Sequence, residues 1–114
     1  PRSLGAINRH FPLNLKYYLS LMPSKKIKSE IKYNDIIIRL YKYKLEDPIS
    51  VESNIEAFDL ENNLLWIAEN CSRGRYFEMQ IDELNNLLET NDGGSMHYEI
   101  ELNKGKIISK RIIK

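Results

Sequence analysis

The sequence is short of the residues on which disulfides, metal sites and most small catalytic centres depend. Its 114 residues include one cysteine, Cys71, and two histidines, His10 and His97. A single cysteine excludes an internal disulfide and is typical of a reducing compartment, so we expect a cytoplasmic protein. Because no group of histidine, cysteine and acidic residues stands at the short spacing of metal ligands, we also expect neither a metal nor a cofactor.

Long apolar runs are missing as well. No stretch approaches the roughly 18 consecutive apolar residues of a membrane-spanning helix. The opening Pro1-Arg2-Ser3-Leu4 is not followed by the apolar segment of a signal peptide. With 42% hydrophobic and 29% charged residues, the composition is that of an ordinary globular protein, and the length suits one domain. We therefore predict a single domain over residues 1–114 with no membrane partner.

Catalytic constellations are also hard to find. Catalysis by nucleophile and base needs two such side chains within hydrogen-bonding reach. Cys71, in a loop beside Arg73 and Arg75, could pair with His97, and the two cations would lower the pKa of the thiol. A lone loop cysteine without a local signature is usually incidental, however. The sequence therefore favours a protein that is not an enzyme.

Residues 54–69 form the centre of the predicted fold. Two apolar runs flank a polar turn, which is typical of a β-hairpin. Asn62 and Asn63 can supply the positive φ values that such a turn needs. Trp66 and Phe58 offer the largest apolar area in the hairpin, so we expect the core to form around them.

The chain is predicted to divide into three parts. Residues 1–13 show no clear period and are interpreted as a flexible arm. Residues 14–22 are predicted to form a short helix, because Leu15, Tyr18, Leu19 and Met22 follow a helical spacing and Pro23 ends it. A β-rich core is expected over residues 25–114.

Alternation then predicts a first hairpin. Residues 25–33 place Ile27, Ile31 and Tyr33 on one face and Lys26, Lys28, Glu30 and Lys32 on the other. This pattern is typical of a half-buried edge strand, where lysines block unwanted pairing. Asn34 and Asp35 make a two-residue turn into residues 36–45, whose apolar start indicates a central strand.

The C-terminal half is predicted to contain a strand, a helix and a last hairpin. Residues 76–81 alternate, with Phe77, Met79 and Ile81 expected inward. Asp82 can cap a short helix with Leu84, Leu87 and Leu88 on one face. Residues 96–102 and 106–113 form the hairpin around Asn103-Lys104-Gly105. We therefore predict a mainly β (α+β) fold: one antiparallel sheet or open barrel of about six to seven strands with two short helices.

The two later hairpins resemble each other. Residues 59–65, Asp-Leu-Glu-Asn-Asn-Leu-Leu, align with residues 101–107, Glu-Leu-Asn-Lys-Gly-Lys-Ile, at an offset of 42. The first hairpin is similar to the repeat of pyrroloquinoline-quinone-type β-propellers, in which a strand ends in an acid, turns, and returns through an apolar pair and a tryptophan. A propeller needs at least four blades and this length holds two at most, so the resemblance is confined to the hairpin motif and implies no cofactor.

Charge is unevenly distributed along the chain. Residues 1–45 carry ten Lys and Arg against two acids, a net +8. Residues 46–102 carry fourteen acids against two arginines, a net −12, and residues 103–114 carry five cations and no acid. Such asymmetry can mark an interaction surface, although basic and acidic strands can also neutralise each other across a sheet.

In its size and composition the chain resembles the small cytosolic immunity proteins of bacterial toxin systems. Those are commonly single β-rich domains, rich in lysine, isoleucine and asparagine, with an acidic patch that plugs a basic toxin active site. The resemblance implies inhibition by binding. On the predicted strands the candidate partner-binding residues are Glu56, Glu78, Glu99 and Glu101, and the competing interpretation is a solvated sheet face.

A second interpretation is a small nucleic-acid-binding module. Basic and aromatic residues interleave in the N-terminal hairpin, where Tyr41 and Tyr43 could stack on bases. The candidate phosphate contacts are Lys26, Lys28, Lys32, Lys42 and Lys44. The formal net charge of +1 argues against a dedicated nucleic-acid binder, so a protein partner remains the first hypothesis.

Overall fold

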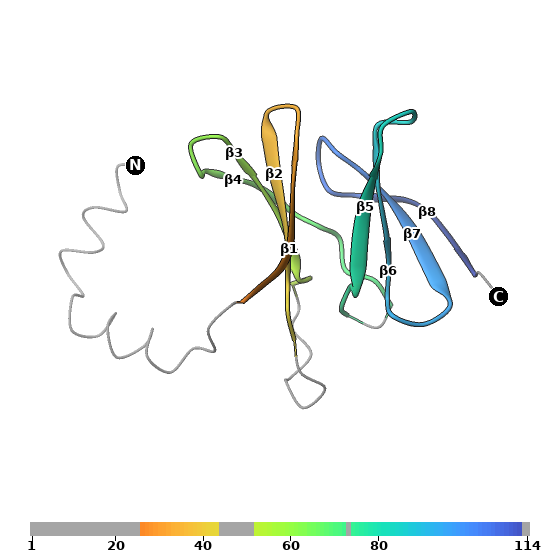
Figure 1. Ribbon diagram of the computed structural model, residues 1–114. Coiled ribbons are helices and arrows are strands. Elements are labelled where there is room, and N and C mark those ends of the chain that lie inside the picture. The colour runs from red at the N-terminus through yellow and green to blue at the C-terminus, as the bar shows by residue number, and fades with distance from the viewer. Residues whose placement is uncertain (1–25, 44–51, 73, 113–114) are drawn as a thin grey trace, which may run out of the picture.

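Eight strands form two four-stranded antiparallel sheets in the computed structural model, which describes residues 26–43, 52–72 and 74–112 (Figure 1). The first sheet contains β1 (Ile27–Tyr33), β2 (Ile36–Tyr41), β3 (Ile55–Asp59) and β4 (Leu64–Ile67). The second contains β5 (Glu78–Asp82), β6 (Leu87–Asn91), β7 (Met96–Glu101) and β8 (Ile107–Ile112). In both sheets each strand pairs with the next one along the chain, and β1 of the first sheet contacts β5 of the second.

Turn residues that tolerate a left-handed backbone explain this strand order. Asn34 lies between β1 and β2 with a φ of 53°, and Asn62 lies between β3 and β4 with a φ of 68°. Asparagine adopts this region more readily than other non-glycine residues, so each turn reverses the chain within a few residues. The predicted turns at Asn34 and Asn62 are confirmed, as are the edge position of β1 and the central position of β2.

One core lies between the two sheets. Its buried members are Ile38, Leu40, Ile55, Ala57, Trp66, Ala68, Cys71, Tyr76, Leu88, Tyr98, Ile100 and Leu102. The expectation that Trp66 belongs to the core is confirmed, since 7% of it is exposed. The expectation for Phe58 is wrong: it is half-buried and lies outside this cluster, with the guanidinium carbon of Arg39 4.8 Å from its ring centroid. Phe58 follows Ala57, and alternation turns it to the other face of β3.

Trp66 connects the sheets through the turn after β7. Its indole Nε1 donates a hydrogen bond to the carbonyl oxygen of Leu102 at 2.9 Å. Gly105, whose φ is 74°, lies against the indole ring, where a Cβ atom would approach Cε3 to 2.5 Å. Glu69 adds two bonds to the same region, from its amide to the carbonyl of Gly105 at 2.8 Å and from the amide of Ile107 to its carboxylate at 2.9 Å. The last hairpin is therefore held to the end of the first sheet.

Residues 59–65 and 101–107, which are similar in sequence, occupy equivalent positions in the two sheets. Both segments connect the third and fourth strands. Both hairpins also carry a register shift at equivalent places, between Ala57 and Phe58 in β3 and between Glu99 and Ile100 in β7. Ala57 pairs with Trp66, and its equivalent Glu99 pairs with Ser109, so the second turn is one residue longer.

The prediction of one sheet with six to seven strands is wrong, because eight strands divide into two sheets. The predicted helix after Asp82 is also wrong: residues 83–86 form a turn and the chain continues as β6. The Asp82 carboxylate accepts hydrogen bonds from the Asn85 backbone at 3.2 Å and side chain at 2.8 Å, and Asn86 has a φ of 57°. Local bonds of this kind compete with a helix and reverse the chain.

The prediction for the start of β5 needs a similar correction. Tyr76, not Phe77, is fully buried, and 43% of Phe77 is exposed. Tyr76 meets Tyr98 edge to face, with ring centroids 5.6 Å apart, and its hydroxyl donates to the Glu69 carbonyl at 2.5 Å. Burial raises the pKa of the Tyr76 hydroxyl, which keeps it a neutral donor. Met79 and Ile81 pack against the core as expected.

The predicted arm at residues 1–13 and helix at residues 14–22 lie outside the described residues, as does Lys44. Within residues 26–43, 52–72 and 74–112 no helix has the length and apolar character needed to cross a membrane.

Candidate functional site

The outer face of the second sheet, which points away from the core, gathers carboxylates from three strands. Alternation turns Leu88, Tyr98 and Ile100 inward, so their neighbours in sequence point outward. The carboxylates on this side, which we name the acidic face, are Glu78, Asp82, Glu89, Glu99 and Glu101. Three neighbouring strands thus supply one rigid surface with a strong negative charge.

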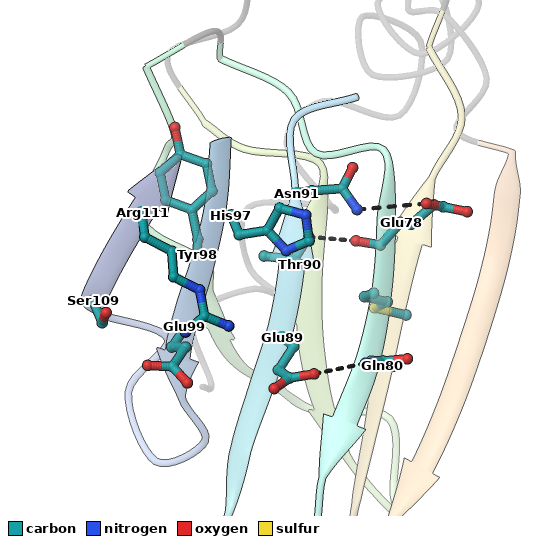
Figure 2. A pocket seen from close by; sticks show the side chains of 11 residues that line it. Glu78, Gln80, Glu89, Thr90, Asn91, His97, Tyr98, Glu99, Ser109 and Arg111 are labelled. Carbon is teal, nitrogen blue, oxygen red and sulfur yellow. Dashed lines mark hydrogen bonds between the residues drawn. The ribbon is translucent and has the colours of Figure 1, made fainter. Parts of the chain in front are cut away.

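A hollow of about 390 Å³ lies over this face (Figure 2). The residues that line it are Glu78, Met79, Gln80, Glu89, Thr90, Asn91, His97, Tyr98, Glu99, Ser109 and Arg111. Three glutamates in this lining face one arginine and one histidine. Arg111 and His97 are paired across β7 and β8, so the single arginine stands at the β8 side of the hollow.

Glu89 and Glu99 lie directly opposite each other in the β6–β7 ladder. The Glu89 carboxylate accepts a hydrogen bond from the Gln80 side chain at 2.6 Å. Ligand oxygens of Asp82, Glu89 and Glu99 all lie within 4.8 Å of one another. Oxygen ligands of this type are those that a hard divalent cation prefers, so these three residues could hold one.

Hydrogen bonding fixes the ionisation of Asp82 at the edge of this cluster. The Asn85 side chain donates to the Asp82 carboxylate and lowers its pKa, and the backbone amide of Asn85 lowers it further. Asp82 is therefore charged throughout the neutral range.

The structure brings two of the four predicted partner-binding residues into the hollow, Glu78 and Glu99. Glu101 lies on the same face at the end of β7, where its carboxylate accepts a hydrogen bond from the Lys104 amide. Glu56 lies in the first sheet instead and is 9% exposed. Burial raises the pKa of the Tyr41 hydroxyl, and a hydrogen bond with Glu56 raises it further.

Sequence reasoning missed Asp82 and Glu89. The prediction of a helix after Asp82 separated these residues from the strands on either side. Leu88 and Thr90 alternate with Leu87, Glu89 and Asn91. This period of two is typical of a strand, and it is the sequence pattern that could have identified the two residues.

The lysines of the N-terminal hairpin are divided between its two ends. Lys28 and Lys42 lie together at the end away from the turn, where the Lys42 amide donates to the Lys26 carbonyl at 2.7 Å. Lys26 is exposed beside them, whereas Lys32 pairs with Ile37 near the Asn34 turn. The hairpin therefore does not present one continuous row of lysines.

The candidate nucleophile is enclosed. Cys71 is 5% exposed, belongs to the core, and its thiol donates to the Arg75 carbonyl at 3.1 Å. His97 lies in the hollow on the outer side of the second sheet.

The chain matches no protein-family model, no curated protein and no solved structure.

Proposed function

We propose that this protein is a non-enzymatic binding domain whose acidic face captures a basic surface on another protein. The face is rigid because it is built on strands, and it is preorganised because neighbouring strands fix the spacing of its carboxylates. Charge complementarity of this kind speeds association and sets the orientation of the partner.

The main support for this proposal is that Glu89 and Glu99 lie directly opposite each other on β6 and β7. Like charges directly opposite each other in an antiparallel ladder oppose folding by about 0.2–1 kcal/mol. The nearby Asp82 adds to this repulsion. A cationic partner would relieve the repulsion on binding, so the same carboxylates that weaken the free fold strengthen the complex.

The internal repeat supports a solvent-facing role for this side of the sheet. Ile55, Ala57 and Trp66 face the core in the first sheet, and their equivalents in the second sheet are His97, Glu99 and Ser109. Polar residues replace apolar ones at every one of these three positions. A further apolar sheet would leave their charges unpaired and dehydrated, whereas a basic surface would pair them.

The partner that fits is a protein with a basic cleft. The active site of a toxin that acts on nucleic acid or another anionic substrate is a cleft of this type, and the likeness to bacterial immunity proteins implies such a target. The acidic face would neutralise the toxin by occupying that cleft.

Glu99→Lys is the sharpest test. Its lysine would stand opposite Glu89 and form a favourable cross-strand pair, so the fold is retained. We avoid Glu101, because its carboxylate caps the turn after β7. The matched control is Glu61→Lys, which makes the same charge change at an exposed turn of the first sheet.

The three proteins are immobilised and exposed to nuclease-treated lysate, and bound proteins are compared by mass spectrometry. We expect a stoichiometric basic partner on wild type and Glu61→Lys that is lost from Glu99→Lys. With the purified partner, the association rate should fall steeply as salt rises. Equal retention on all three proteins would refute the acidic face as the binding site.

A further inference from the structure

A second concave site lies where the open end of the β1–β2 hairpin meets the segment that enters β5. It has a volume of about 370 Å³ and is lined by Lys28, Lys42, Tyr43 and Phe77. Two cations and two aromatic rings therefore share one pocket, with no acid among these four lining residues. Its volume is within the range of roughly 300–1,000 Å³ that is usual for small-molecule sites.

The position of Lys28 results from an irregularity in β1. Ile27 pairs with Tyr41 and Ser29 with Leu40, so Lys28 is an extra residue between two pairs. A bulge of this kind re-aims a side chain. The Lys28 ammonium donates to the Phe77 carbonyl at 2.5 Å and lies 3.4 Å from the centroid of the Phe77 ring. An ammonium has three donors, so Lys28 can still donate to another acceptor in addition to its contacts with the Phe77 carbonyl and ring.

A third cation lies against one of the rings that line the pocket. The guanidinium carbon of Arg75 is 4.8 Å from the centroid of the Tyr43 ring, and Lys42 is exposed at the rim. Lys28, Lys42 and Arg75 come from three separate segments, and the fold brings each of them to the pocket or to one of its two rings. Lysine binds phosphate as a point charge, and arginine can bind it through two parallel hydrogen bonds.

The aromatic residues decide which anion fits. Phe77 is 43% exposed although its neighbour Tyr76 is fully buried, so part of a large apolar ring is left in water while the Lys28 ammonium covers one of its faces. Free phosphate or an acidic peptide would use the cations but not this ring. A nucleotide uses both, because its phosphate meets the cations while its base stacks on an aromatic side chain.

We propose that this pocket binds a nucleotide unit, with the phosphate held by Lys28, Lys42 and Arg75 and the base packed against Phe77 and Tyr43. The unit can be a free mononucleotide or one residue of a single-stranded nucleic acid, since both carry the same two groups. This site goes beyond the acidic face, which offers carboxylates to a basic partner. Phe77 directly precedes Glu78, so the two sites meet at the start of β5 and repel each other's ligands.

Binding is measured by fluorescence anisotropy with a labelled single-stranded oligothymidylate of about twelve residues at low salt. We expect Lys42→Glu to weaken binding about tenfold and to flatten the dependence on salt, because one phosphate contact is lost. Phe77→Leu should weaken it about fivefold or more through lost stacking. Lys42 is exposed and outside the core, and the melting temperature of each variant verifies that it is folded.

Lys32→Glu is the matched control, because it makes the same charge change on the same hairpin near the opposite end. Its binding should remain close to that of wild type. Competition by AMP at concentrations comparable to the oligonucleotide would assign the pocket to a mononucleotide, and competition by the oligonucleotide alone would assign it to one position of a longer strand.

Three outcomes would overturn the proposal. The first is no binding of either nucleotide probe. The second is an equal loss in Lys32→Glu and Lys42→Glu, which would mean diffuse attraction to the hairpin. The third is displacement by inorganic phosphate or polyglutamate with no effect of Phe77→Leu, which would mean that any anion suffices. Glu99→Lys should bind the probe at least as well as wild type, so a failure here is separate from a failure of the acidic face.

Discussion

Gly105→Ala tests whether the contact with Trp66 holds the two sheets together. The φ of Gly105 is 74°, a conformation that alanine adopts only with strain. A Cβ atom at this position would lie 2.5 Å from Cε3 and 2.8 Å from Cδ2 of the indole. The indole is 7% exposed, so it has no free space into which it can move without disturbing the core.

Three costs determine the size of the effect. The left-handed conformation costs alanine about 1 kcal/mol relative to glycine. Forcing extra volume into a packed site costs about 1–3 kcal/mol. Displacing the indole also weakens its hydrogen bond to Leu102, which contributes about 1 kcal/mol. We expect a loss of about 3–5 kcal/mol from a total free energy of unfolding of roughly 5–15 kcal/mol.

Urea unfolding followed by tryptophan fluorescence measures this loss directly, because Trp66 is the only tryptophan. The matched control is Gly93→Ala. Gly93 has a similar φ of 83°, but an added Cβ would lie 3.3 Å from the Cβ of Phe77, whose side chain is exposed. This control should lose only about 1–2 kcal/mol. Equal losses in the two variants would refute the role of the indole contact.

Two further predictions concern carboxylates. The amide and side chain of Asn63 donate to Asp59 and lower its folded-state pKa, so the stabilisation by this charge is present above about pH 4 and is lost as pH falls through the folded-state value. Near neutral pH the wild-type protein should therefore have a higher melting temperature than Asp59→Asn, and the two melting temperatures should converge in acid. A difference that stays constant with pH would contradict this. Glu99→Gln should stabilise the fold by about 0.2–1 kcal/mol by removing repulsion with Glu89, and the gain in melting temperature should shrink in high salt.

The hairpins were predictable because their determinants are local. Asn34 and Asn62 supply turns, and strict alternation marks β7 and residues 29–33 of β1. The predicted face of β1 is wrong only for Ile27, which the bulge at Lys28 leaves 46% exposed. A turn residue and a period of two act within a few positions of the chain, so neither depends on what the strand later packs against. The burial of Trp66 was also predictable from its size.

The helix predicted after Asp82 failed because two patterns coincide there. Leu84, Leu87 and Leu88 have helical spacing. An aspartate whose side chain accepts a hydrogen bond from the residue three positions later is also as compatible with a helix cap as with a turn. The structure separates the leucines: Leu84 is 92% exposed at the turn, whereas Leu88 is fully buried. Pairing with β5 and β7 makes strand the better state for residues 87–91, and the helical spacing of the leucines gives no sign of that pairing.

The sequence by itself determined the β class, most of the strands, their turns and the uneven distribution of charge. Tertiary structure decided that the strands divide into two sheets, that Trp66 reaches across to Gly105, and that the acidic face includes Asp82 and Glu89. It also brought Phe77 from the second half of the chain to Lys28 and Lys42. The physical reason is that turns and alternation depend on neighbouring residues, whereas the meeting of distant segments depends on which apolar faces bury each other.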